Sequence, residues 1–322
     1  VLEGRTITVA AYFQQRYGFS NSENLDGLDV MMPRFSFEYT PRFEPEWNGF
    51  SARRMRITGG FGLFSGGAAT VWVSNSFSNT GVLGAAVSCF RNQSNANCGG
   101  ALGAGVSDNV VLNSLQTAAD YRNLPAAFEN LLNPALPNIE NIRRAASANG
   151  IDPAFQPVQT WKSSLTFSTD LSFPYIGDDY NFQVDFLRGD VRQAILWKDY
   201  RAGLTPVGRA PDGRPIYRNA AQRGAFVAGA GNDTGNDLVL TNTDEGFQQA
   251  WAFSLSKGWE NGIDASFSYT YTDAKDVNPG TSSVAFSNWG NLATADINNP
   301  GLATSNYEIK HQFKGRLSVR RA

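Results

Sequence analysis

Large apolar residues alternate with small polar ones over residues 247–273. The arm Phe247–Gly258 places its large apolar residues at odd positions, and the arm Ile263–Asp273 does the same. Alternation with a period of two is typical of β-strands that expose two different faces. Glu260-Asn261-Gly262 separates the two arms, and Asn-Gly tolerates the positive φ angles of a tight turn. This stretch is therefore predicted to form a β-hairpin.

The chemistry of the two faces separates this hairpin from one in a water-soluble protein. Its apolar face is large and aromatic, with Trp251 and Trp259 toward the two ends, whereas its polar face is almost entirely Ser, Thr, Ala and Gly. A soluble sheet that turns its apolar face inward would show water a face rich in Lys and Glu. Aromatic residues that flank an apolar band are typical of outer-membrane barrel strands. An antiparallel sheet of a soluble β protein is the alternative interpretation.

The same alternation predicts further strands along the chain. Their ranges are Arg5–Phe13, Pro33–Tyr39, Arg53–Leu63, Trp161–Phe173, Tyr180–Arg188 and His311–Val319. The connections between successive strands are alternately long and short, and outer-membrane barrels have short periplasmic turns and longer extracellular loops. The predicted fold is therefore all-β: an antiparallel transmembrane β-barrel segment, about eight strands of a larger barrel, with long extracellular loops.

The long connections hold most of the sequence outside the strands. The longest is an insertion at about 64–160, in which Asn113–Asn149 carries apolar residues at mixed helical spacings that prolines interrupt. Tyr200–Glu245 and Ala274–Glu308 are predicted to be further loops. We expect the long loops to face outward and short turns such as Pro174–Asp179 to face the periplasm.

Composition narrows the classes of function. The chain has 322 residues and a net charge of −2, which gives no sign of a nucleic-acid-binding surface. The sequence contains no run of about 18 apolar residues, so no transmembrane helix is predicted, as expected for barrel strands that are only half apolar. The first residues lack the regions of a signal peptide and the last ones fall inside an alternating strand. We therefore expect the sequence to be a fragment of a longer protein.

Four segments match the sequence patterns of one known family, in the same order. They are RITGGFGLFSGGAATVWVSNSFSNTGV at Arg56–Val82, Ala210–Arg218, Ser268–Trp289 and Asn306–Val319. The first resembles a family pattern in which a strand of the form RGGxGLFxG leads into VWxSNxYxNTG. Together they resemble the barrel of TonB-dependent outer-membrane receptors of the Oar-like kind. The resemblance implies a barrel of about 22 strands with a plug inside. Residues 1–322 are then expected to be a partial receptor barrel domain, with the plug domain, the TonB box and the C-terminal strand lying outside the chain.

The resemblance also implies a function and a location in the outer membrane of a Gram-negative bacterium. A receptor of this family binds a scarce solute at its outer loops and imports it when the TonB energy-transducing complex acts through the plug region. The expected partners are outer-membrane lipid, that complex, and an unknown small-molecule or peptide substrate. No cofactor and no nucleic-acid partner are expected. The alternative is an Oar-like surface protein for adhesion or protein secretion, whose loops bind a macromolecule.

Residues with catalytic or metal-binding chemistry are few. His311 is the only histidine, and a Ser-His-Asp or Cys-His site would need it as general base. Its position at the start of a strand favours an interface residue, so no catalytic residue, no metal site and no enzymatic activity are predicted. Gly59-Gly60-Phe61-Gly62 fits neither a Walker A nor a dinucleotide-binding pattern. These glycines are instead expected to permit a bend or a bulge at the barrel rim.

Aromatic residues in the long loops are the candidates for ligand contact, because loops on a rigid scaffold often carry binding function. They are Trp72, Phe77, Tyr200, Phe286 and Trp289. Packing of one loop against another is the alternative role.

Two further loop features suggest chemistry. Cys89 and Cys98 are the only cysteines and have eight residues between them. Such a pair in an exported loop is interpreted as a disulfide, because oxidising compartments preserve these bonds; two free thiols are the alternative. Gly231–Asp237 offers Asn and Asp oxygens to calcium, but it lacks the spacing and distal Glu of an EF-hand, so a solvated polar loop is the alternative.

Overall fold

A computed structural model gives the fold of most of the chain. It describes residues 13–14, 17–21, 23, 25–66, 70–78, 109, 112–113, 147–217 and 235–320. The chain divides into two compact units. The first unit comprises residues 1–24, 71–153 and 198–240, and the second comprises residues 25–70, 154–197 and 241–322.

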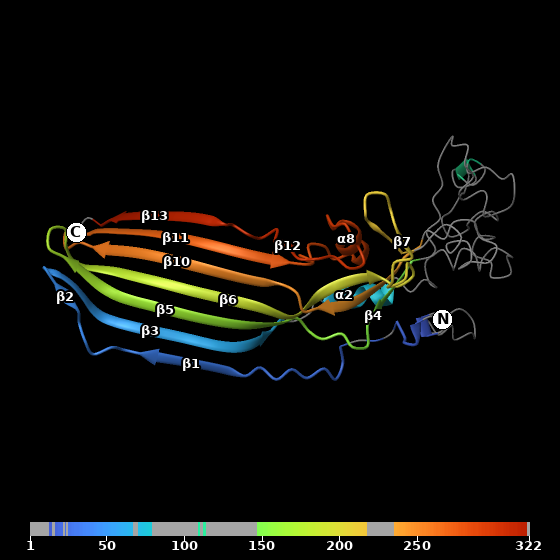
Figure 1. The fold of residues 1–322 in the computed structure, drawn as a ribbon, viewed down its shortest axis with the longest axis horizontal. Helices are drawn as coiled ribbons and strands as arrows, with labels where there is room; N and C mark the ends of the chain where they lie inside the picture. Colours follow the sequence, from blue (N-terminus) through green and yellow to red (C-terminus); the bar gives the residue numbers. More distant parts are fainter. Residues whose placement is uncertain are drawn as a thin grey trace. The chain divides into compact units, whose positions relative to one another are not determined.

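The second unit is built on one antiparallel sheet (Figure 1). Its long strands are β1 (Arg34–Tyr39), β3 (Phe50–Ser65), β5 (Gln159–Phe173), β6 (Gly177–Asp199), β10 (Phe247–Gly258), β11 (Ile263–Asp276) and β13 (His311–Val319). Each pairs antiparallel with the next in this order. The short strands β2 (Glu46–Trp47) and β12 (Ala303–Thr304) pair with β3 and β11. The prediction of a β fold that is mostly antiparallel is confirmed.

Short turns join the strands at one end of this sheet, the left end in Figure 1. In the turn from β10 to β11, the Gly262 amide donates to the Trp259 carbonyl and Gly262 has a φ of 81°. A Cβ at Gly262 would lie 2.4 Å from the Arg320 carbonyl oxygen, so only glycine fits both the φ angle and the space. The hairpin predicted from Asn261-Gly262 is confirmed, as is the alternation of short and long connections from β1 to β13.

The strand register separates the side chains into two faces. Trp251 lies opposite both Phe186 and Tyr271, whereas Ser254 lies opposite Gln183 and Ser268. We call the side that carries Trp251 the aromatic face and the side that carries Ser254 the small-residue face. As predicted, Phe167, Trp251, Phe253, Leu255, Phe267 and Tyr269 share the first, and Ser254, Ser256, Ser268 and Thr270 share the second.

The glycines of β3 do not make a bulge. The register shift in β3 lies between Arg53 and Arg56, where Arg54 has a φ of 49°. Gly59 pairs regularly, and the Phe37 ring covers it so closely that a Cβ would lie 2.5 Å from the ring. A bulge at these glycines is therefore wrong: the ring packs on the bare backbone, as aromatic residues do on strand glycines.

The first unit contains a small closed core. Strand β4 (Ala148–Ile151) pairs in parallel with the start of β9 (Asp237–Thr243), with Ala148 opposite Asp237. Phe13, Ala148 and Val239 form the core, and Tyr17, Phe19 and Tyr200 pack against it. Helix α2 (Thr70–Ser78) belongs mostly to this unit.

Several predicted boundaries are wrong. Phe13 was expected to end a strand but lies in a helical turn, fully buried. Asn149 was expected in a helical segment but pairs with Leu238 in the parallel ladder. Strand β6 runs to Asp199, well beyond the predicted Arg188. The predicted loops also contain regular elements: β9, a hairpin of β7 (Gly208–Arg209) with β8 (Pro215–Ile216), and helix α8 (Ala285–Gly290). No helix in the described part of the chain has the length and apolar character needed to cross a membrane.

Candidate functional site

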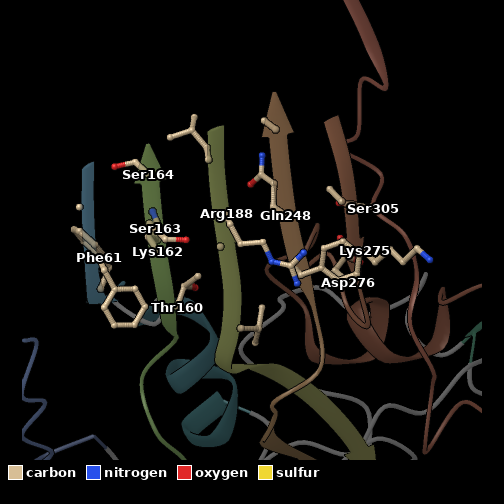
Figure 2. A pocket seen from close by; sticks show the side chains of 18 of the residues that line it. Phe61, Thr160, Lys162, Ser163, Ser164, Arg188, Gln248, Lys275, Asp276 and Ser305 are labelled. Carbon is tan, nitrogen blue, oxygen red and sulfur yellow. The ribbon is translucent and has the colours of Figure 1, made fainter. Parts of the chain in front are cut away.

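A groove with a volume of about 920 Å³ lies on the sheet of the second unit. Residues of β1, β3, β5, β6, β10 and β11 line it, together with Ser305 and Tyr307. Figure 2 shows lining side chains across these neighbouring strands, from Phe61 on one side to Lys275 and Ser305 on the other. Most of the lining residues lie on the small-residue face of the sheet.

The groove is hollow because its floor has little side-chain volume. Gly60 and Gly189 contribute none, and Ser164, Ala250 and Ala274 contribute little. In the register, Gly189 lies opposite both Lys162 and Gln248, so the backbone is bare between two longer side chains. Small residues on neighbouring strands therefore create the space, and the longer side chains form its walls.

Two cations share one aromatic ring in the wall of the groove. The Arg34 guanidinium carbon lies 4.4 Å from the centroid of the Phe64 ring, and the Lys162 ammonium nitrogen lies 5.4 Å from it. Both distances suit cation–π attraction. Arg34 and Lys162 are exposed and Phe64 is half-buried.

Strand register brings these two cations together. Gly62 on β3 lies opposite Arg34 on one side and Lys162 on the other. A Cβ at Gly62 would lie 2.9 Å from Cγ of Arg34, so the arginine stem lies over the glycine. Phe64 is two residues further along β3 and faces the same way, so both side chains reach it.

A different arginine in the groove has its charge compensated. Arg188 donates to Asp190 at 2.6 Å and to the Gln249 side chain at 3.0 Å, and it lies 4.7 Å from the Phe247 ring centroid. Among the described residues that line the groove, Asp276 supplies the one carboxylate. No carboxylate pairs with Arg34 or Lys162 within the described chain.

The first unit holds a buried polar network. Arg201 donates to Asp237 at 2.6 Å, and both side chains are completely buried. Tyr17 donates its hydroxyl to the same carboxylate at 2.6 Å. Asp199 accepts from the backbone amides of Arg201 and Asp237, and from the Asn236 side chain. Burial raises the pKa of Asp199 above its usual range despite these hydrogen bonds.

Tyr200 lies in this unit as a packed residue. Its ring makes edge-on contacts with Tyr17 and Phe19, and its hydroxyl donates to Asp152 at 2.9 Å. Burial, with the Asp152 carboxylate as a second cause, raises the pKa of Tyr200 far above its usual value. Packing within the unit engages the ring of this predicted ligand-contact residue.

The other predicted contact residues lie on two short helices. Trp72 and Phe77 are on α2, where Trp72 is half-buried and Phe77 is exposed. Phe286 and Trp289 are on α8, with ring centroids 5.9 Å apart. Trp289 donates its Nε1–H to Asn298 at 3.0 Å, whereas Phe286 is 53% exposed. The structure brings Phe286 and Trp289 together and leaves Phe286 available for contact.

The remaining candidates are placed as follows. His311 lies on β13 with its Nδ1 2.9 Å from the Tyr269 hydroxyl, on the aromatic face. Asp237 of the possible calcium loop pairs with Arg201, and Asn236 donates to Asp199. Cys89, Cys98 and residues 231–234 of that loop lie outside the described residues.

Sequence reasoning missed the pair Arg34 and Lys162. Lys162 is the one basic residue among the small and acidic residues that share its parity in Trp161–Phe173, which is a signal that the sequence contains. Its proximity to Arg34 depends on the register of three strands, and a 93-residue stretch separates β3 from β5 in the chain. The strand pattern alone does not specify that register.

No protein-family model matches this chain, and a comparison with curated proteins gives no significant match.

Proposed function

We propose that this chain is the barrel part of an outer-membrane receptor that binds a scarce solute and imports it. The observation that carries the proposal is the aromatic face, which is exposed or half-exposed over most of the sheet. Phe35, Phe313 and Leu317 on this face are 66%, 67% and 72% exposed. Contiguous apolar surface of this kind marks contact with an apolar partner or a membrane. The opposite face, made of small and polar residues, suits the polar interior of a barrel.

The extent of the aromatic face supports the bilayer as that partner. On β5 its large apolar residues run from Trp161 to Phe173, which is at least the 9–11 residues or so that a tilted strand needs to cross a membrane. Toward the end of the sheet that carries the long connections, Arg188 and Gln249 lie on the same face as Phe186 and Trp251. Phe247 and Trp161 lie on the same face at this level, so aromatic and charged residues are mixed here, as in the aromatic girdle of a barrel strand.

The groove and the connections support solute binding in particular. The groove has the volume of a small-molecule site, and its neutral floor is framed by a few charged residues. The long connections all leave the sheet at the end opposite the short turns. In the proposed receptor this end faces outward, and the groove lies on the inner wall close to it.

Cysteine accessibility in intact cells tests the proposed orientation. In the full-length protein, Asn261→Cys lies in the short turn between β10 and β11, and Thr281→Cys lies in the connection from β11 to β13. A maleimide too large to cross the outer membrane is expected to label Thr281→Cys and to leave Asn261→Cys unreacted until the cells are lysed. Labelling of both positions, or of Asn261→Cys alone, would contradict the orientation.

One observation favours the alternative, an Oar-like adhesion or secretion protein. The connection that contains α8 is held in place by its own side chains: Asn288 donates to the Ser282 carbonyl, and Asn278 donates to the Asn288 carbonyl. This ordered segment exposes Phe286 and Val284, as a surface for a macromolecule would. Phe286→Ala is expected to reduce adhesion or secretion if the alternative holds, and to leave both unchanged in a solute importer that does not use this segment.

A further inference from the structure

We propose that Arg34, Phe64 and Lys162 bind the acidic group of an anionic organic solute in the groove. The inference rests on the proposed receptor function and names the chemical class of its solute. The site is assembled from three neighbouring strands on the small-residue face, so it belongs to the rigid sheet and not to a loop.

The charge arrangement calls for an anion. Arg34 lies 4.4 Å and Lys162 5.4 Å from the centroid of the Phe64 ring, so the two like charges are within about 10 Å of each other, the screening length at 0.1 M salt. The ring quadrupole attracts each cation, but it does not remove the repulsion between them. Because no described carboxylate pairs with either residue, a bound anion would relieve that repulsion.

The donor geometry selects an oxyanion with more than one oxygen. A guanidinium offers parallel N–H donors that match a carboxylate, phosphate or sulfate in a bidentate manner, and an ammonium adds a compact charge beside it. A cation pair of this kind favours a group that carries two negative charges over one that carries a single charge. Phosphate monoesters and dicarboxylates therefore fit better than neutral solutes.

The rest of the groove indicates that the acidic group is attached to a larger body. A volume of about 920 Å³ greatly exceeds what a free inorganic anion fills. The floor beyond the cations offers hydroxyl and amide groups from Thr160, Ser164 and Gln248, and apolar surface from Leu187 and Val191. This mixture suits a solute with hydroxyl or amide groups and some apolar area.

Chemical protection of Lys162 tests the site in the full-length protein, purified from outer membranes. Acetylation by an N-hydroxysuccinimide ester is followed for each lysine by peptide mass spectrometry. Glucose 6-phosphate at millimolar concentration is expected to slow acetylation of Lys162, and glucose is expected not to. Protection should weaken as salt is added, because the attraction is electrostatic. Lys314, on the small-residue face of β13 and outside the groove, is the internal control and should react at the same rate throughout.

Variants separate the site from non-specific charge. Arg34→Gln should raise the concentration of glucose 6-phosphate that protects Lys162 by about tenfold or more. Arg34→Lys keeps the positive charge and the aliphatic stem over Gly62 but loses the planar guanidinium group. It should therefore weaken protection less than Arg34→Gln does. Lys314→Gln changes the net charge as Arg34→Gln does and should have no effect.

Each outcome decides the proposal. Equal protection by glucose and glucose 6-phosphate, no protection by either, or unchanged protection in Arg34→Gln would overturn it. Protection by inorganic phosphate as strong as that by glucose 6-phosphate would overturn the assignment of an organic body. If the cysteine labelling supports the receptor orientation and Lys162 is not protected, this inference alone is wrong. If Lys162 is protected and the orientation is contradicted, the anion site stands and the receptor function does not.

Discussion

The two units place their large apolar side chains in opposite ways. In the first unit, Phe13 and Val239 are completely buried and rings from Tyr17 and Tyr200 close the core around them. In the second unit, Phe313 and Leu317 point away from the sheet and remain mostly exposed. Since both units use the same residue types, the difference lies in what surrounds each one. A closed core suits a domain in water, and in the proposed receptor the exposed aromatic face would lie against the hydrocarbon of the membrane.

Charged residues differ in the same way. The first unit buries the ion pair of Arg201 and Asp237 completely, with Tyr17 as a further partner. In the second unit, the ion pairs of Arg54 with Asp170 and of Arg188 with Asp190 each include a partner that is at least half-exposed. A buried pair is costly to break because the remaining charge stays out of water, whereas an exposed pair contributes little.

The largest expected effect is in the buried network of the first unit. Arg201→Met leaves Asp237 buried without its guanidinium partner, and breaking such a pair costs about 3–5 kcal/mol. Hydrogen exchange of the backbone amides in β4 and β9 measures this local stability. Arg214→Met, which removes an exposed partner of Asp212, is the control and should leave those amides unchanged. Equal exchange in the Arg201→Met and parent proteins would show that the network does not stabilise the unit.

The two faces of the sheet can be compared at adjacent positions. Phe253→Arg places a charge on the aromatic face and should destabilise the full-length protein in lipid vesicles by about 2–4 kcal/mol. Ser254→Arg places the same charge on the small-residue face and should cost much less, because lumen-facing positions tolerate polar groups. Denaturant unfolding followed by tryptophan fluorescence measures both. Equal losses at the two positions would contradict the assignment of the aromatic face to lipid.

Two glycines test how well each unit is packed. A Cβ at Gly150 would lie 2.6 Å from the buried Phe13 ring, and one at Gly59 would lie 2.5 Å from the Phe37 ring, which is 43% exposed. Overpacking costs about 1–3 kcal/mol where neighbours cannot move. Gly150→Ala should therefore destabilise its unit more than Gly59→Ala destabilises the sheet, because the exposed ring can swing away.

Gly315→Ala is the matched control for these glycines, since it lies on the aromatic face with no atom within 4 Å of its Cβ. It should be close to neutral in the same measurements of unfolding and exchange. A larger loss at Gly59 than at Gly150 would reverse the comparison between a closed core and an open face.

The smallest effect concerns Tyr200 and its pH dependence. Because burial raises its pKa in the folded protein, the neutral hydroxyl is favoured there, and its contribution is fully present below the unfolded value of about 10. That contribution is lost as pH rises through the folded pKa. Tyr200→Phe should cost about 1 kcal/mol at neutral pH through the lost hydrogen bond to Asp152. Because Tyr200 stays neutral near pH 10 in the folded protein, Tyr200→Phe should not change the phenolate absorbance that the other tyrosines develop near pH 10 or so. A decrease in that absorbance would contradict the raised pKa.

Local pattern was enough to predict the strands and hairpins of the sheet. The alternation in Phe247–Asp273 and the Asn261-Gly262 turn act between residues close in sequence, so the hairpin and its two faces could be read directly. The same holds for β5 and for the alternation of short and long connections. The proposed membrane-facing side depends on the same local feature, namely which residue types fall on one face of a strand.

Only the tertiary structure decided the contacts that join distant segments. The parallel pairing of β4 with β9 joins Ala148 to Asp237, and no local pattern specifies which short apolar segments pair across such a separation. Phe13 looked like a strand residue because alternation over a few positions does not show whether a segment finds a sheet neighbour or a core.

The groove shows the same division most clearly. The sequence by itself determined that Arg34, Gly62 and Lys162 each lie on a strand in which apolar and polar residues alternate. Their meeting around Phe64 depends on the register of β1, β3 and β5, in which Gly62 stands opposite both cations. A shift of one residue would turn one cation to the other face, so the anion site is a property of the folded sheet. The alternation of apolar and polar residues depends only on neighbours in the sequence, whereas the register between strands depends on contacts over the whole sheet.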